Sequence, residues 1–244
     1  MQEKYYYFWI DFFSAIFPLL FCFFPLSNPV YKKWKAILPA IIIPAILFLI
    51  WDNLYTRWGV WNFNPRYLTG SYFFNLPVEE VAWFFCIPYA CIFSYEAILH
   101  FIKKDVVGKN QVYISAVLVI SLVLIASFNI GRIYTSVTFF LLAAFLSWVQ
   151  WIWKPDFFGR FYVAFLFILI PFFIVNGLLT GTALDEAIVR YDDTENLGIR
   201  MGTIPVEDTF YGMLLILMNI SLFEFLQKKS ARKNSDASPI YFFN

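Results

Sequence analysis

The chain has 244 residues, of which 61% are hydrophobic, 23% aromatic and only 14% charged. This composition leaves too few polar side chains to cover a soluble globule, so it excludes an ordinary soluble protein and indicates an integral membrane protein. The formal net charge of +1 gives no sign of a nucleic-acid partner.

Apolar runs of membrane-spanning length recur along the whole chain. They predict an all-α membrane protein with seven transmembrane helices in a single domain, 1–244. The expected helices lie near 5–25, 37–52, 77–101, 112–129, 134–153, 161–180 and 205–227. The polar segment 228–244 is expected to be a cytoplasmic tail.

The positive residues predict how the chain is oriented. Seven crossings place the two termini on opposite sides of the membrane. Twelve of the 18 Lys and Arg residues follow the first, third and fifth helices or lie in the tail. Because Lys and Arg are enriched on the cytoplasmic side, we expect a cytoplasmic C-terminus and an outer N-terminus.

An internal repeat is the most informative feature of the sequence. With a shift of 128 residues, "TGSYFFNLPVEE" from Thr69 aligns with "LGIRMGTIPVED" from Leu197. The match predicts two three-helix repeats, about 5–101 and about 134–227, joined by a linking helix at about 112–129. A shift of four crossings preserves direction, so the repeats should be parallel and both motifs should lie at the outer face.

Each repeat carries two adjacent acids after Pro-Val: Glu79 and Glu80 in the first, Glu207 and Asp208 in the second. Proline at a first helical position loses no hydrogen bond, so we expect a helix to start there with both acids in its first turn. Brought together in an apolar site, the two pairs would repel, and at least one acid should keep its proton. Such an acid is a candidate proton donor, and the alternative is that the acids only cap their helices.

Two aromatic residues are expected beside these acids. Trp83 lies one helical turn after Glu79, and Tyr211 lies one turn after Glu207. An aromatic face stabilises a neighbouring cation, so both are candidates for that role, with ordinary packing as the alternative. The cysteines fall in apolar runs without metal-ligand spacing, so we expect no metal site.

The chain resembles a known family at four places. "LPVEEVAWFF", "IPVEDTFYG", "WDNLYTRWGVW" from Trp51 and "NGLLTG" from Asn176 are similar to the carotenoid cyclases of the two-component type. These are the small membrane lycopene cyclases of bacteria and archaea, found also in fungal bifunctional enzymes and in some organisms as two separate polypeptides. The resemblance covers about Trp51 to Leu226. Both motifs are intact, which suggests the fused, single-chain form.

The resemblance implies a lycopene β-cyclase, expected in a bacterial inner membrane. An acid protonates C2 of an acyclic end, the C5=C6 bond attacks the cation at C1, and loss of the C6 proton gives a β-ionone ring. Two such steps convert lycopene into β-carotene through a one-ring intermediate without net redox change, so no cofactor is expected. The expected partners are the lipophilic carotenoid, the lipid bilayer and other enzymes of carotenoid biosynthesis.

The implied site residues follow from the matched segments. The catalytic candidates are Glu79, Glu80, Glu207 and Asp208, with Glu79 and Glu207 slightly favoured because the family keeps Glu at the first acidic position. The candidates for cation stabilisation or substrate binding are Trp83, Tyr211, Asp52, Asn176 and Tyr191.

Other functions remain open at this stage. A cyclase acting on a C50 carotenoid or forming ε rings would use the same motifs. A proton-coupled transporter would also place acids in repeats, although such proteins typically break helices at mid-membrane, whereas Pro77 and Pro205 open helices here. A carotenoid-binding subunit is a third alternative, and a retinal photoreceptor would need a lysine within the last helix, which has none before Lys228.

Overall fold

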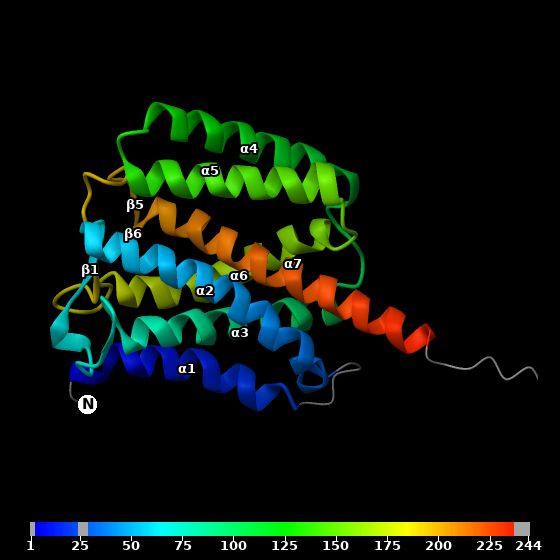
Figure 1. The fold of residues 1–244 in the computed structure, drawn as a ribbon, viewed down its shortest axis with the longest axis horizontal. Coiled ribbons are helices and arrows are strands. Elements are labelled where there is room, and N and C mark those ends of the chain that lie inside the picture. Colours follow the sequence, from blue (N-terminus) through cyan, green and yellow to red (C-terminus); the bar gives the residue numbers. More distant parts are fainter. Residues whose placement is uncertain (1–2, 24–28, 237–244) are drawn as a thin grey trace, which may run out of the picture.

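The computed structural model describes residues 3–23 and 29–236 and consists mainly of helices running along a common direction (Figure 1). The α-helices are α1 (Tyr6–Phe21), α2 (Trp34–Trp58), α3 (Val78–Phe101), α4 (Gln111–Phe128), α5 (Ile133–Ser147), α6 (Phe158–Leu179) and α7 (Val206–Asp236). The short strands are β1 (Trp61–Phe63), β2 (Tyr72–Phe73), β3 (Leu76–Pro77), β4 (Val189–Tyr191), β5 (Arg200–Met201) and β6 (Ile204–Pro205). A π-helix, Trp148–Trp153, extends α5.

Six of the described helices are long and apolar enough to cross a membrane, which agrees with an all-α membrane protein. They are the helices built around α2, α3, α4, α5, α6 and α7. With its 16 residues, α1 is about 24 Å long at about 1.5 Å per residue, so it is shorter than a hydrocarbon core of roughly 30 Å. Residues 24 and 25 of the expected first helix, and 237–244 of the expected tail, lie outside the described residues.

Two helices, α2 and α7, continue well past the ends predicted from hydropathy. The expected helix 37–52 ended at Asp52, the first charged residue, but Asp52 is only 2% exposed and α2 continues past it to Trp58. The helix ends where Gly59 adopts a φ of +79°, a conformation that glycine allows without strain. At the other end of the chain, α7 continues through Lys228 to Asp236, so the first part of the expected tail is helical.

The order in which the helices pack positions the site. The first helix of each half packs on the third: α1 on α3 and α5 on α7. The second helix of each half packs on the third helix of the other half: α2 on α7 and α6 on α3. All the short strands and the N-terminal ends of α3 and α7 lie at one end of the bundle, and the C-terminal end of α7 extends beyond the other (Figure 1).

A short ribbon joins the two halves at the strand end of the bundle. Strands β1 and β4 pair antiparallel, with Trp61 opposite Tyr191 and Phe63 opposite Val189. One backbone hydrogen bond flanks each end of the ribbon, from Asn64 N to Ile188 O at 2.8 Å and from Asp192 N to Val60 O at 2.9 Å. The 128-residue shift relates Asn64 to Asp192 and Val60 to Ile188, so the two bonds are equivalent under the repeat. We did not predict strands, because three residues between helices give no alternating pattern long enough to recognise.

A two-strand hairpin precedes each acidic motif. Strand β2 pairs with β3 before α3, and β5 pairs with β6 before α7. Pro77 ends β3 and precedes the first helical residue, Val78, with φ −62° and ψ +149°. The prediction that the prolines occupy the first helical position was therefore wrong by one residue, since Pro205 likewise ends β6 and α7 begins at Val206. Both acids of each motif still lie in the first turn.

Candidate functional site

The four motif acids are all buried. The two acids of each motif are adjacent on a helix, so their side chains point in directions about 100° apart. Glu79 is 2% exposed, Glu80 9%, Glu207 0% and Asp208 4%. The two members of each pair therefore face different surroundings. Burial at this level is costly for a carboxylate unless it is hydrogen-bonded, so the partners of each acid indicate its role.

The first acid of each motif holds the loop that precedes it. Glu79 Oε1 accepts a hydrogen bond from the backbone N–H of Thr69 at 2.6 Å. Glu207 Oε1 accepts the equivalent bond from the N–H of Leu197 at 2.8 Å, and a second from the Thr135 hydroxyl at 2.6 Å. Both backbone donors lie ten residues before their acceptor, so the two halves repeat the same contact. Neither Glu79 nor Glu207 lines the central pocket described next.

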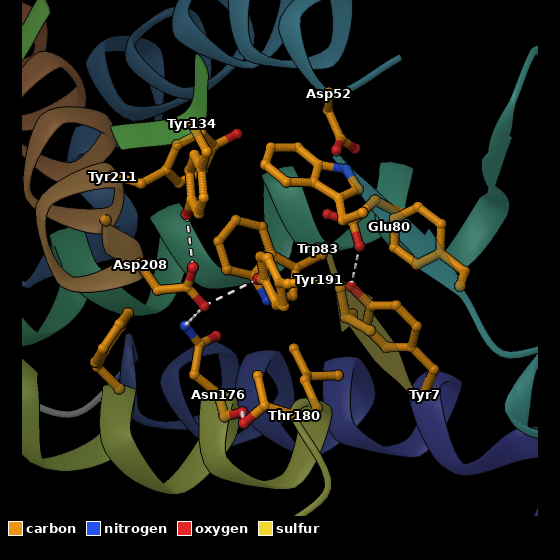
Figure 2. A pocket seen from close by; sticks show the side chains of 16 residues that line it. Tyr7, Asp52, Glu80, Trp83, Tyr134, Asn176, Thr180, Tyr191, Asp208 and Tyr211 are labelled. Atoms are coloured by element: carbon orange, nitrogen blue, oxygen red, sulfur yellow. Dashed lines mark hydrogen bonds between the residues drawn. The ribbon is translucent and has the colours of Figure 1, made fainter. Parts of the chain in front are cut away.

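The second acids, Glu80 and Asp208, face one pocket between the two halves (Figure 2). Tyr7 of α1 donates a hydrogen bond to Glu80. Asp208 accepts bonds from Tyr134 at 2.6 Å and Tyr191 at 2.9 Å, and a longer one from the Asn176 amide at 3.5 Å. Residues 128 positions apart thus contribute one carboxyl group each to the same site.

Aromatic rings form much of the remaining wall. The Trp61 ring lies edge-on to Tyr134, with centroids 5.2 Å apart, and Tyr134 stacks on Tyr191 at 5.9 Å. Trp83 and Tyr211 line the same pocket, which encloses about 50 Å³. Ring faces around two acids provide a surface that stabilises a carbocation without supplying a nucleophile.

A third carboxylic acid, Asp52 of α2, also lines the pocket and is 2% exposed. Its Oδ2 atom makes no hydrogen bond of ordinary geometry among the described residues, and the Trp61 side chain lies close enough to be a weak donor to the carboxyl group. The position equivalent to Asp52 in the other half is Thr180, which lines the pocket and is bonded to Thr203 at 2.7 Å. The two halves of the pocket are therefore similar in position and different in chemistry.

Tyr191 belongs to β4 and so lies outside the helices that are long enough to cross the membrane. Burial raises the pKa of Tyr191 well above its ordinary value, and the neighbouring Asp208 carboxyl raises it further. Tyr191 therefore remains protonated and continues to donate its hydrogen bond to Asp208 at neutral and moderately alkaline pH.

Seven of the nine residues predicted for the site lie around this pocket, and two lie beside it. The seven are Glu80, Asp208, Trp83, Tyr211, Asp52, Asn176 and Tyr191. The two that hold the loops are Glu79 and Glu207. Proximity alone leaves the catalytic role of each residue a prediction.

Several lining residues were not predicted. Tyr7 and Tyr134 donate to the acids from α1 and α5, and Trp61, Phe63 and Phe172 complete the walls. A signal for Tyr134 was available, because extending the 128-residue shift upstream aligns it with Tyr6, next to Tyr7. Ring positions such as Phe172 give no such signal in a chain that is 23% aromatic.

Other polar residues with notable surroundings lie outside the acid pocket. Asp11 is 3% exposed, and neither carboxyl oxygen has a hydrogen-bond partner among the described residues. Arg200 forms an ion pair with Asp193 at 2.5 Å. At the far end of the bundle Tyr95 donates to Glu224 at 2.6 Å, and Lys33 pairs with Glu96.

Fold and site together define a class: a helical membrane protein in which two repeated acidic motifs converge on a buried aromatic pocket. The chain belongs to the lycopene cyclase family, whose model matches residues 4–98 and 131–226. The match has two parts, corresponds to the two halves described above and leaves out α4. Neither the curated proteins nor the solved structures contain a significant match.

Family membership supports a lycopene cyclase activity, and with it a lipophilic carotenoid substrate in a membrane. A continuous chain that carries both matched segments is consistent with the fused form of the enzyme.

Proposed function

We propose that this protein is a lycopene β-cyclase that converts lycopene into β-carotene by proton-initiated cyclisation of each end in turn, through a one-ring intermediate. The observation that carries the proposal is the convergence of Glu80 and Asp208, one from each half, on one buried pocket with aromatic walls. Ring formation needs a proton donor, a proton acceptor and a surface that tolerates a cation, and this pocket contains candidates for all three.

Different hydrogen-bond partners suggest how the acids divide the work. Asp208 receives three donors, including two phenols, and such donors stabilise a carboxylate. Glu80 receives one bond, from Tyr7, among those seen in the described residues. We therefore assign proton donation to Glu80 and proton acceptance to Asp208.

In the proposed reaction, the proton of Glu80 forms a bond to C2 and leaves a cation at C1. The C5=C6 double bond attacks C1, which closes the ring and moves the cation to C5. The C6 proton then passes to Asp208 as the C5=C6 double bond is restored. Atoms and electrons balance without an oxidant, and return of a proton from Asp208 to Glu80 resets the enzyme.

This assignment shifts the emphasis from the first acid of each motif to the second. Glu79 and Glu207 already accept backbone hydrogen bonds from the preceding loops. In the proposal they hold each hairpin against its helix and so aim Glu80 and Asp208 into the pocket, while Trp83, Tyr211 and Trp61 face the cation.

For the membrane arrangement, we propose seven spans in two parallel repeats, with α4 as the linking helix. Equivalent helices pack in the same order in both halves, and all the motifs lie at one end of the bundle. In this arrangement α1 is a short seventh span, begun by the 3-10 helix Glu3–Tyr5. The excess of Lys and Arg at the opposite end supports an outer site and a cytoplasmic C-terminus.

The decisive experiment is expression of the chain alone in cells that accumulate lycopene. We expect lycopene to be replaced by β-carotene, with γ-carotene, which has one ring, appearing early. Separation of the pigments by chromatography also reveals ε rings, and feeding an acyclic C50 carotenoid tests chain length. Unchanged lycopene after confirmed membrane expression would contradict the proposal.

A further inference from the structure

The acid pocket continues into one apolar groove along the helices. This α1–α6 groove encloses about 220 Å³ between α1 and α6, with α3 and α7 behind it. It shares four lining residues with the acid pocket, namely Trp83, Phe172, Asn176 and Gly212. The shared residues make the groove a continuation of the site.

The other half has a matching groove that does not reach the acids. The α2–α5 groove encloses about 740 Å³ and is lined by residues of α2, α5 and α7. Several of its positions are those of the α1–α6 groove shifted by 128 residues; Phe145 corresponds to Phe17 and Met218 to Ala90. Yet this larger groove shares no lining residue with the acid pocket among the described residues.

Side-chain size explains why one groove connects and the other does not. In the α2–α5 groove, Phe48 and Trp51 pack against Tyr211, with ring centroids 5.1 Å away in each case, and close the way to the acids. Phe48 also packs near Phe84, with ring centroids 6.2 Å apart. In the other half, the positions equivalent to Phe48 and Phe84 are occupied by the smaller Asn176 and Gly212. A Cβ atom on Gly212 would already lie 3.2 Å from the Phe172 ring.

The lining of the α1–α6 groove suits a hydrocarbon chain entering from the bilayer. Its rim includes Phe17, 55% exposed, and Phe13, 48% exposed, whereas Ile216 and Leu215 on its floor are 3% and 1% exposed. From Trp83 to Ser94 it follows α3 for about 16 Å at about 1.5 Å per residue. That distance is roughly half an extended C40 chain, which is comparable in length to a hydrocarbon core of roughly 30 Å.

We propose that the α1–α6 groove binds the polyene chain of the substrate and admits it from the bilayer, while the α2–α5 groove does not lead to the acids. This inference rests on the proposed function and deepens it. It makes Gly212 and Ala90 positions that determine access, and it allows one end of the carotenoid to reach the acids at a time. The second end reaches the acids after the chain leaves and re-enters the groove.

The test is a matched pair of substitutions at equivalent positions. Ala90→Trp fills the α1–α6 groove away from the acids, and Met218→Trp adds the same ring to the α2–α5 groove. Each variant, and separately the unsubstituted chain, is expressed in lycopene-accumulating cells. Ring products are measured per amount of membrane-inserted protein. We expect Ala90→Trp to lose about tenfold or more of the rate and Met218→Trp to stay within about twofold.

Three results separate the two proposals. No ring product from the unsubstituted chain would overturn the proposed function and the inference with it. Full activity of Ala90→Trp, or an equal loss in both variants, would overturn the groove and leave the function standing. If Ala90→Trp fails to insert, the milder Ala90→Leu takes its place, and its rate should still fall below that of Met218→Trp.

A binding measurement supplies a readout independent of turnover. In a Glu80→Gln background, lycopene retained by the purified protein in detergent is measured from its visible absorption. Adding Ala90→Trp should remove most of the retained lycopene, whereas adding Met218→Trp should leave it. Equal retention in the two double variants would contradict the inference.

Discussion

Glu80 and Asp208 occupy equivalent positions 128 residues apart and face the same pocket, but their hydrogen-bond partners differ. Tyr7 donates to Glu80, whereas Tyr134, Tyr191 and Asn176 donate to Asp208. A repeat that supplied two identical half-sites would give the two acids the same donors. The proposed division of roles, with Glu80 releasing the proton and Asp208 accepting it, rests on this difference in donors.

The first prediction separates the two acids of each motif. Glu80→Gln and Asp208→Asn should each reduce ring formation by about a hundredfold or more, because the amide can neither donate nor accept the proton as required. Glu79→Gln should retain most of the activity, since the amide oxygen can still accept the Thr69 N–H bond. Pigment analysis at matched membrane expression measures all three.

The opposite pattern would be equally clear. If Glu79→Gln were inactive and Glu80→Gln active, the first acid of the motif would carry the chemistry, as the family pattern favours. A protein equally active with either substitution would assign neither acid to catalysis.

The second prediction uses the difference between Tyr191 and its counterpart, Phe63. Tyr191→Phe removes one donor to Asp208 and should lower the rate about tenfold, the effect of losing one hydrogen bond to a charged group. The aromatic wall stays intact, so the folded protein should accumulate normally. Phe63→Tyr changes the equivalent ring on the other side and serves as the control; a larger loss in that variant would contradict the assignment.

The third prediction concerns the loop contacts of Glu207. Glu207→Ala leaves the Thr135 hydroxyl and the Leu197 N–H without their acceptor, so it should destabilise the fold by about 1–3 kcal/mol. Glu207→Gln keeps an acceptor oxygen and should be milder. Thermal unfolding in detergent, followed by size-exclusion chromatography, ranks the variants; equal stability of Ala and Gln would contradict the structural role.

The fourth prediction concerns alkaline pH. Since burial and Asp208 raise the pKa of Tyr191 in the folded protein, its contribution to stability is complete below the unfolded tyrosine pKa of about 10. The contribution is lost as the pH rises through the folded pKa. The unsubstituted protein should therefore lose thermal stability above about pH 10 more steeply than Tyr191→Phe, and parallel curves would exclude this effect.

Hydropathy and the repeat predict much of the fold because each helix is a long apolar segment with its own signal. They fail where a buried polar residue interrupts the pattern, as Asp52 does inside α2. They also miss the strands, whose pairing joins residues such as Trp61 and Tyr191 that are far apart in sequence.

The candidate site was predictable to the extent that it lies next to the repeated motif. Trp83 and Tyr211 follow the acids on the same helices, so spacing places them near the pocket. Tyr7 comes from a helix 73 residues away, and no local pattern indicates that it reaches Glu80. Which acid of each adjacent pair faces inward depends on how the hairpin meets the helix, and spacing alone does not determine that.

The ribbon of β1 and β4 has a consequence for how the chain could be divided. It pairs backbone with backbone, and the bonds from Asn64 and Asp192 close it symmetrically. In one polypeptide, α4 raises the local concentration of each half for the other. If the chain were cut between α3 and α4, one fragment would carry β1 and the other β4, whose edges are complementary. Association of the two fragments would then depend on their concentration in the membrane.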